Sequence, residues 1–182
     1  LRRQIVPPAL RWEVLVVDNN CTDATPELLR RAAEGFPVPL RHCRVPEQGV
    51  SSAGNRGVAE ARGVRLAFVD DDTFPDEDWL GAIWRTFEAH GCHGVVGKIG
   101  LAWLADRPRW LTEDLLGFLG RLDYGPDERP LTSNAEPPNG GNMAFARMVF
   151  DKIGGFDPAL GRKRRSLWGD EEPDLFRRFL AV

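Results

Sequence analysis

Short apolar runs alternate with helix-favouring segments through the first hundred residues of the chain. The apolar runs have the length and composition of buried strands and lie at residues 13–17, 40–45, 64–69 and 94–99. Between them we expect helices over residues 26–33, 52–62 and 76–90. Since parallel strands need long connections that are usually helices, this alternation predicts an α/β fold with a central, mostly parallel sheet flanked by helices.

The pattern weakens in the second half of the chain. Pro, Gly and charged residues interrupt the apolar pieces between residues 101 and 138, so we expect an irregular segment with a short helix near Leu115. Regular structure is expected again from Asn142, with a helix over residues 148–153 and an amphipathic helix from Asp174 to the end. No internal repeat divides the sequence, and residues 1–182 are expected to form one domain.

Composition argues against several classes of protein and site. Hydrophobic residues make up 42% of the 182 residues, which is enough for a globular core, and the net charge of -3 argues against a nucleic-acid partner. The three cysteines lack the spacing of metal ligands, which predicts reduced thiols in a cytoplasmic protein and no zinc site. The three histidines are scattered, and we expect them to be structural or exposed. No apolar stretch approaches the roughly 18 residues of a membrane span.

Acidic residues follow two of the predicted strands. Asp18 ends the first strand, and Asp70-Asp71-Asp72 follows the third. In an open parallel sheet, ligands bind beyond the carboxyl ends of the strands. Three adjacent carboxylates repel one another, and a divalent cation that also binds phosphate oxygens would offset the repulsion. The triplet therefore predicts a metal–diphosphate site; the alternative is that Asp72 caps the next helix while its neighbours are solvated.

Two other enzyme classes place acids near the end of an apolar strand. In a phosphatase of the Asp-x-Asp-x-Thr type, a Thr stands four residues after the first Asp. This chain has Phe74 at that position, and Thr73 comes one residue early. A nucleotidyltransferase normally has a Gly-rich phosphate loop after its first strand, and the sequence shows no such loop. Spacing therefore excludes the first class and argues against the second.

Six segments resemble those of family 2 inverting glycosyltransferases of the GT-A fold, and they come in the same order. They are residues 13–23 (EVLVVDNNCTD), 47–63 (EQGVSSAGNRGVAEARG), 67–80 (AFVDDDTFPDEDWL), 139–146 (NGGNMAFA), 153–157 (IGGFD) and 169–178 (GDEEPDLFRR). Each is weak alone, but together they span nearly the whole chain. The resemblance implies a Rossmann-like nucleotide-diphospho-sugar transferase fold. It assigns nucleotide-sugar binding to residues 1–100, and acceptor binding and catalysis to residues 101–182.

The resemblance implies a metal-dependent enzyme that moves a sugar from a nucleotide-sugar, with UDP-sugars the leading expectation. The acceptor would be a saccharide or a lipid-linked hydroxyl in polysaccharide or glycolipid synthesis. Asp72 matches the direct ligand of Mn²⁺ or Mg²⁺, and Asp70 matches a second ligand nearer the ribose. The matching substrate-binding residues are Asp18, Asn20, Asn55, Arg56, Asp70, Asp71, Gly141, Asn142 and Asp170. Asp18 would contact the nucleobase, and the Gly140–Asn142 loop would face the donor sugar and the acceptor.

The family pattern places the catalytic base in an acidic pair just ahead of Asp174. Glu172 is our first choice for the base and Glu171 the second. Pro173 suits the first position of the last helix, so we expect Glu172 in an extended loop at a helix N-terminus, where an ionised carboxylate is favoured. From the residues alone, the alternative that Asp170, Glu171 and Glu172 form only an acidic helix start stays open.

A basic tract lies in the second half of the chain, and the two chain ends also bear on the fold. Residues 162–165 (RKRR) form either a solvated loop or a contact with the diphosphate or an anionic lipid-linked acceptor. The second alternative predicts peripheral contact with the inner face of the membrane. The sequence begins inside the helix that follows the family's first strand, so we expect a natural protein that is longer at both ends. A sheet without that central strand would lose stability, and a non-catalytic sugar-nucleotide-binding fragment is an alternative.

Overall fold

The computed structural model describes residues 1–161 and 169–182. The first half contains β1 (Val14–Asp18), α1 (Thr25–Ala33), β2 (Leu40–Arg44), α2 (Val50–Glu60), β3 (Arg65–Phe68), α3 (Trp79–His90) and β4 (Gly94–Val96). The second half contains the 3-10 helices η1 (Glu113–Leu119) and η2 (Gly140–Asn142), then β5 (Met143–Ala146), α4 (Arg147–Ile153) and α5 (Glu171–Leu180). The predicted alternation of strands and helices in the first half is confirmed.

The described strands form two sheets. β1 and β2 pair in parallel, from Val14 opposite Leu40 to Asp18 opposite Arg44. In the second sheet β5 lies between β3 and β4 and runs antiparallel to both. The expected parallel pairing is present in β1–β2, whereas both pairings of β5 in the second sheet are antiparallel. The described strands are divided between the sheets β1–β2 and β3–β5–β4, and β5 reverses the direction.

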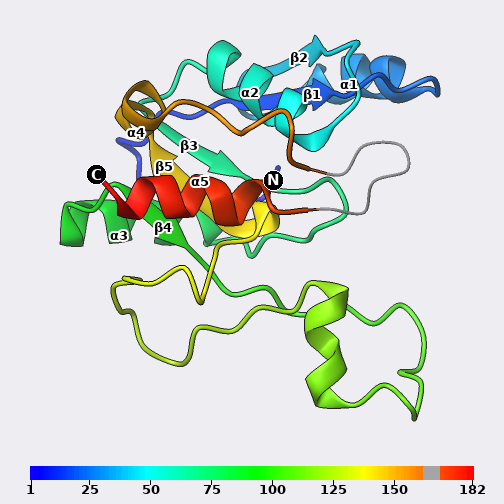
Figure 1. Ribbon diagram of the computed structural model, residues 1–182. Helices are drawn as coiled ribbons and strands as arrows, with labels where there is room; N and C mark the ends of the chain where they lie inside the picture. The colour runs from blue at the N-terminus through cyan, green and yellow to red at the C-terminus, as the bar shows by residue number, and fades with distance from the viewer. Residues whose placement is uncertain (162–168) are drawn as a thin grey trace.

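The hydrophobic core is built around β5. Its residues Met143, Ala144 and Phe145 are at most 2% exposed, as expected for the middle strand of a covered sheet. Phe150 of α4 packs edge-on against Phe145 with ring centroids 5.9 Å apart, and Leu175 of α5 belongs to the same buried cluster. Figure 1 shows α5 crossing in front of the β3–β5–β4 sheet. The core thus fixes the start of α5 relative to the ends of β3 and β5.

Side-chain hydrogen bonds join α2 to the second half of the chain, among them those of Arg147 and Asn55. Arg147, at the start of α4, donates from Nη1 to the carbonyl of Val58 (2.9 Å) and from Nε to that of Gly63 (3.0 Å). These bonds satisfy carbonyls at the C-terminal end of α2 and just beyond it. Asn55 of α2 donates to the carbonyl of Phe156 (2.8 Å) and accepts from its N–H (2.7 Å). The helix that packs on β1 is therefore also hydrogen-bonded to the elements around β5.

The α-helices begin one to three residues away from their expected starts. α3 begins at Trp79, because Asp76 accepts the N–H of Asp78 (2.9 Å) and closes a turn ahead of the helix. The cap of α1 is Ala24, one residue before the expected Thr25. α5 begins at Glu171, three residues earlier than expected, and Pro173 lies within its first turn. Pro is tolerated there because first-turn N–H groups have no partner within the helix.

Residues 100–138 form a lobe that extends away from the two sheets (Figure 1). It contains η1, which confirms the short helix expected near Leu115. Leu111 and Leu116 are buried inside the lobe, whereas Trp110 and Phe118 are exposed. Among helices in residues 1–161 and 169–182, none combines the length and the apolar character that a membrane crossing requires.

Candidate functional site

The carboxylate of Asp18 is buried at the carboxyl end of β1. The residue is only 2% exposed, and its Oδ1 accepts the N–H of Cys21 at 2.6 Å. This hydrogen bond holds the pKa of Asp18 below its ordinary value, so the carboxylate stays ionised. His42 Nε2 lies 3.5 Å from Oδ2, which has no hydrogen-bond partner among residues 1–161 and 169–182. A buried acceptor of this kind is suited to a ligand that brings an N–H donor.

The loop after β1 is held by asparagines. Asn19 donates to the carbonyl of Glu47 (2.7 Å) and accepts the N–H of Gly49 (2.7 Å), so it fixes the entry to α2 beside the end of β1. Asn20 adopts a left-handed backbone with φ of 64° and accepts a hydrogen bond from Arg44 Nη2 (3.1 Å). Asn tolerates this conformation better than most residues. The role of Asn19 in fixing the entry to α2 was not predictable from local sequence, because its partners lie about thirty residues away.

The acidic triplet forms a turn directly after β3. Thr73 donates to the carbonyl of Asp70 from its N–H (3.3 Å) and from its hydroxyl (2.8 Å). All three residues are exposed, although the carboxylate of Asp70 is partly desolvated. Partial burial and the charges of Asp72 and Asp71 raise the pKa of Asp70. The turn therefore presents three mutually repelling acids that a cation would stabilise.

The Gly140–Gly141 backbone lies between the carboxylates of Asp70 and Glu172. The N–H of Gly140 donates to Glu172 Oε1 at 3.2 Å. A methyl group at Gly140 would lie 2.8 Å from Glu172 Oε1 and 3.9 Å from Asp70 Oδ1, and one at Gly141 would lie 3.2 Å from Asp70 Oδ2. The absence of side chains at these glycines lets the backbone approach both carboxylates closely. Thus β3, η2 and α5 each contribute to one acidic site.

Glu172 has an unusually high affinity for a proton. Burial, the charge of Glu171 and the charge of Asp70 raise the pKa of Glu172 to about 7, although the N–H of Gly140 acts in the opposite direction. We had expected this residue in a loop that favours its ionised form, and both expectations are wrong. The residue lies in the first turn of α5, and burial beside two acids outweighs the favourable end of the helix.

Glu171 faces a different part of the molecule. It is only 4% exposed, and its Oε2 has no hydrogen-bond partner in the described parts of the chain. A methyl group at Gly161 would lie 3.5 Å from this oxygen and 3.0 Å from the hydroxyl of Ser51, which is fully buried in α2. Glu171 is therefore buried next to Gly161, whereas Glu172 borders the Gly140–Gly141 loop.

Several other predicted site residues are engaged within the chain. Asn142 donates to the carbonyl of Lys98 (2.9 Å) and accepts from the indole of Trp79 (2.9 Å), so its amide is already paired. Both amide atoms of Asn55 are paired with Phe156. Arg56 is exposed and pairs with Glu60 at 2.8 Å, and Asp170 is the exposed residue just before α5. Their substrate contacts stay predictions, and the basic tract at residues 162–165 lies outside the described residues.

The donor set fits a divalent cation that also takes ligands from a substrate. Within residues 1–161 and 169–182, no group of three or more His, Cys, Asp and Glu side chains is placed to hold a metal. Mg²⁺ is often bound by one or two carboxylates together with substrate phosphates and water, and carboxylate oxygens also suit Mn²⁺. The exposed, crowded acids at residues 70–72 match that mode of binding. A cation there would require a phosphate-bearing ligand to complete its coordination.

Comparison with known proteins identifies the family. The sequence profile of glycosyl transferase family 2 matches residues 1–154. The chain belongs to glycosyl transferase family 2. The glucosyl-dolichyl phosphate glucuronosyltransferase of Haloferax volcanii is 29% identical over 157 residues, which cover 82% of this chain and 47% of that protein. The succinoglycan biosynthesis protein ExoM of Rhizobium meliloti is 28% identical over 106 residues, covering 58% and 34% of the two chains.

Solved structures show the same fold as this family 2 chain. The mannosyltransferase PcManGT of Pyrobaculum calidifontis, in complex with GDP-Man and Mn²⁺, has a TM-score of 0.61 at 23% identity and covers 92% of this chain and 42% of its own. TarS of S. aureus in complex with UDP has a TM-score of 0.64 at 17% identity, with coverage of 88% and 45%. These likenesses confirm the expected GT-A fold. This chain spans less than half the length of each of these four proteins.

Proposed function

We propose that this family 2 chain transfers a sugar from a nucleoside-diphosphate sugar to an acceptor hydroxyl, with inversion at the anomeric carbon. The observation that carries the proposal is the placement of Glu172 beside Asp70, with the Gly140–Gly141 backbone between them. One carboxylate belongs to the acidic turn that would hold the diphosphate. The other has a proton affinity suited to deprotonating a hydroxyl at neutral pH.

The donor would bind across the ends of β1 and β3. The free Oδ2 of Asp18 would accept an N–H of the nucleobase, which uracil and guanine both offer. Asp72 and Asp70 would hold Mn²⁺ or Mg²⁺ together with the diphosphate oxygens. When bound, the cation supplies Lewis-acid stabilisation of the charge that develops on the leaving diphosphate. UDP-sugars remain our leading donors, and the names of the solved neighbours make GDP-sugars the first alternative.

Glu172 would take the proton of the acceptor hydroxyl as that oxygen attacks the anomeric carbon from the face opposite the diphosphate. Inversion follows from this single displacement. A base whose pKa lies near 7 is ionised in about half of the molecules at neutral pH and still binds a proton strongly. Glu171 is the second choice for the base. Its carboxylate is buried near Gly161 and is not among the groups nearest Gly140 and Gly141, which favours Glu172.

The acceptor would be a saccharide or a lipid-linked hydroxyl. This part of the proposal is supported by the names of two relatives, a glucosyl-dolichyl phosphate glucuronosyltransferase and a succinoglycan biosynthesis protein. Because this chain covers less than half of each of those proteins, its own activity needs a direct test.

Measurements of donor binding and of donor hydrolysis distinguish the role of Asp72 from that of Glu172. UDP-, GDP- and dTDP-sugars are titrated calorimetrically with and without Mn²⁺ against the wild type, Asp72→Ala and Glu172→Ala, with Glu88→Ala as a control on the outer surface of α3. We expect metal-dependent binding to be lost in Asp72→Ala. In Glu172→Ala, binding should be retained and turnover lost. Binding without turnover in every form, the wild type included, would instead indicate a sugar-nucleotide-binding module.

A further inference from the structure

Residues 122–138, which we call the strap, are the last part of the lobe and lead to the Asn139–Asn142 loop. Apart from one bridge at its start, where Leu122 pairs with Ile99, the strap contains no helix or strand. It is folded on itself, because the hydroxyl of Tyr124 donates to the carbonyl of Pro137 at 3.0 Å. Arg129 reinforces this closure by donating to the carbonyl of Tyr124 (3.3 Å) and pairing with Glu136. The strap can therefore move as one unit.

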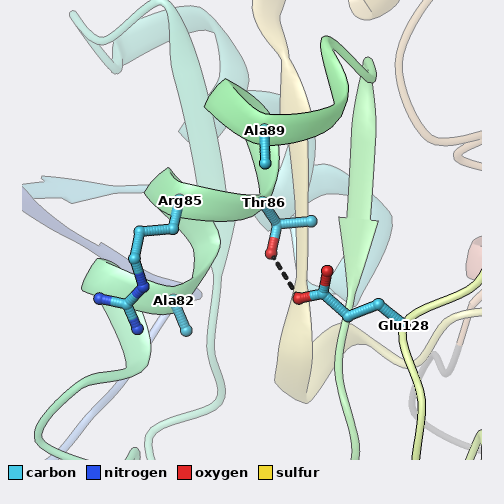
Figure 2. A pocket seen from close by; sticks show the side chains of 5 residues that line it. All are labelled: Ala82, Arg85, Thr86, Ala89 and Glu128. Carbon is cyan, nitrogen blue, oxygen red and sulfur yellow. Dashed lines mark hydrogen bonds between the residues drawn. The ribbon is translucent and has the colours of Figure 1, made fainter.

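Glu128 connects the middle of the strap to α3. Its carboxylate accepts the hydroxyl of Thr86 (3.2 Å) and lies 2.9 Å from His90 Nε2. Figure 2 shows Glu128 reaching toward the helix and bonding to Thr86. Beside this bond is a hollow of about 150 Å³, lined by Ala82, Arg85, Thr86, Ala89 and Glu128. The strap and the helix border an open hollow here, and the polar contacts of Glu128 with Thr86 and His90 join them beside it.

The same helix also holds the loop at the end of the strap. Trp79, the first residue of α3, donates to Asn142 Oδ1, and Asn142 donates to the carbonyl of Lys98 at the start of the lobe. The next residues back along the chain, Gly140 and Gly141, are those that lie between Asp70 and Glu172. The N-terminal end of α3 thus fixes one side of the loop, and the attachment of the strap fixes the other.

We propose that Glu128 is a latch: it holds the strap against α3 and thereby positions the Asn139–Asn142 loop at the acidic site. The proposal rests on the proposed function only where it concerns the acceptor. The latch is weak by construction, since the side chains of Glu128 and His90 are 69% and 54% exposed and exposed pairs contribute little. It is also charged at neutral pH, because hydrogen bonds with His90 and Thr86, and then the nearby charge of Arg85, lower the pKa of Glu128. A weak latch can open and close during each encounter with an acceptor.

Hydrogen exchange measures the latch without any substrate. Backbone amides of residues 123–137 and 139–142 are followed by mass spectrometry in the wild type, Glu128→Ala and Glu128→Gln. The matched control is Glu88→Ala, which removes another ion pair of the same helix, in which Glu88 lies 2.7 Å from Arg65. We expect exchange about two- to five-fold faster in both segments of Glu128→Ala, the range for loss of an exposed pair. Glu128→Gln keeps an acceptor for Thr86, so its exchange rates should lie between those of the wild type and Glu128→Ala. The Glu88→Ala control should exchange at the wild-type rate.

Two results would overturn the latch: unchanged exchange in Glu128→Ala, or a faster strap with an unchanged loop. The positioning role then has its own kinetic signature. With an active donor–acceptor pair, Glu128→Ala should raise the acceptor KM several-fold while the donor KM and kcat stay near wild type, and Glu128→Gln should restore part of the loss. Unaltered acceptor KM would remove the positioning role. A wild type without turnover would refute the proposed function and leave the exchange result to decide the latch.

Discussion

The carboxyl group of Glu172 makes the stability of this chain depend on pH in an unusual direction. Its pKa is raised from 4.5 to about 7 in the folded chain, so between these values the native state keeps a proton that the unfolded chain has released. The difference is about 2.5 pH units, and each unit corresponds to about 1.4 kcal/mol. Stability present at low pH is therefore lost as the pH rises through 7, by up to about 3 kcal/mol from this residue alone.

Replacing Glu172 by Gln removes that penalty. Gln has nearly the same size, can still accept the N–H of Gly140, and does not ionise. At pH 8 we expect Glu172→Gln to be more stable than the wild type by as much as about 3 kcal/mol, or roughly 6–12 °C in Tm for a chain of this length. At pH 5 both forms are largely neutral at this position, and the difference should fall below about 1 kcal/mol.

Urea and thermal unfolding at pH 5, 6, 7 and 8 test this reasoning, with circular dichroism as the signal. Glu88→Gln is the control, because it neutralises an exposed acid on α3 and should show no gain that grows with pH. A stability difference for Glu172→Gln that is the same at pH 5 and pH 8 would refute the raised pKa. The same variant should lose transfer activity. The carboxyl group of Glu172 would then be the group that both lowers stability and serves catalysis.

Three further substitutions test other parts of the site. Asp72→Ala should weaken Mn²⁺-dependent donor binding at least about tenfold in calorimetric titrations, or about 1.4 kcal/mol, and equal affinity would exclude Asp72 as a ligand. Asp18→Asn keeps an acceptor for the N–H of Cys21 but changes the buried charge, so UDP affinity should fall while Tm changes little; unchanged affinity would count against a nucleobase contact. Asn55→Ala should destabilise the chain by about 1–3 kcal/mol in urea unfolding, since it leaves two polar groups of Phe156 without partners.

The parts of the fold that depend on local sequence were predictable. β1 and β3 were expected from apolar runs that stop at Asp18 and Asp70, and they end at Asp18 and Phe68. An apolar run followed by Asp predicts both a strand and an acid just beyond its carboxyl end. The placement of the acids at these ends was therefore predictable from local sequence. The family resemblance was confirmed over residues 1–154.

What depended on distant contacts was not predictable. Asn55 and Phe156 are 101 positions apart, and Trp79 and Asn142 are 63 apart, so no local pattern indicates that these amides are paired. The pKa of Glu172 was misjudged for a related reason. The sequence indicated a helix start, but the burial of that start and the approach of Asp70 arise only when α5 packs beside β3 and η2.

The division of the strands into two sheets has a consequence for how the molecule comes apart. Asp18 belongs to the β1–β2 unit, whereas Asp70 and Glu172 belong to the unit built on β3, β5 and α5. Separate sheets can open with separate free energies, since local unfolding follows cooperative units of structure. A donor that touches Asp18 with its base and Asp72 with its diphosphate would fasten the two units, adding RT ln(1 + [L]/Kd) to the stability of both. Two unfolding transitions in the free chain would then merge into one when the donor is bound.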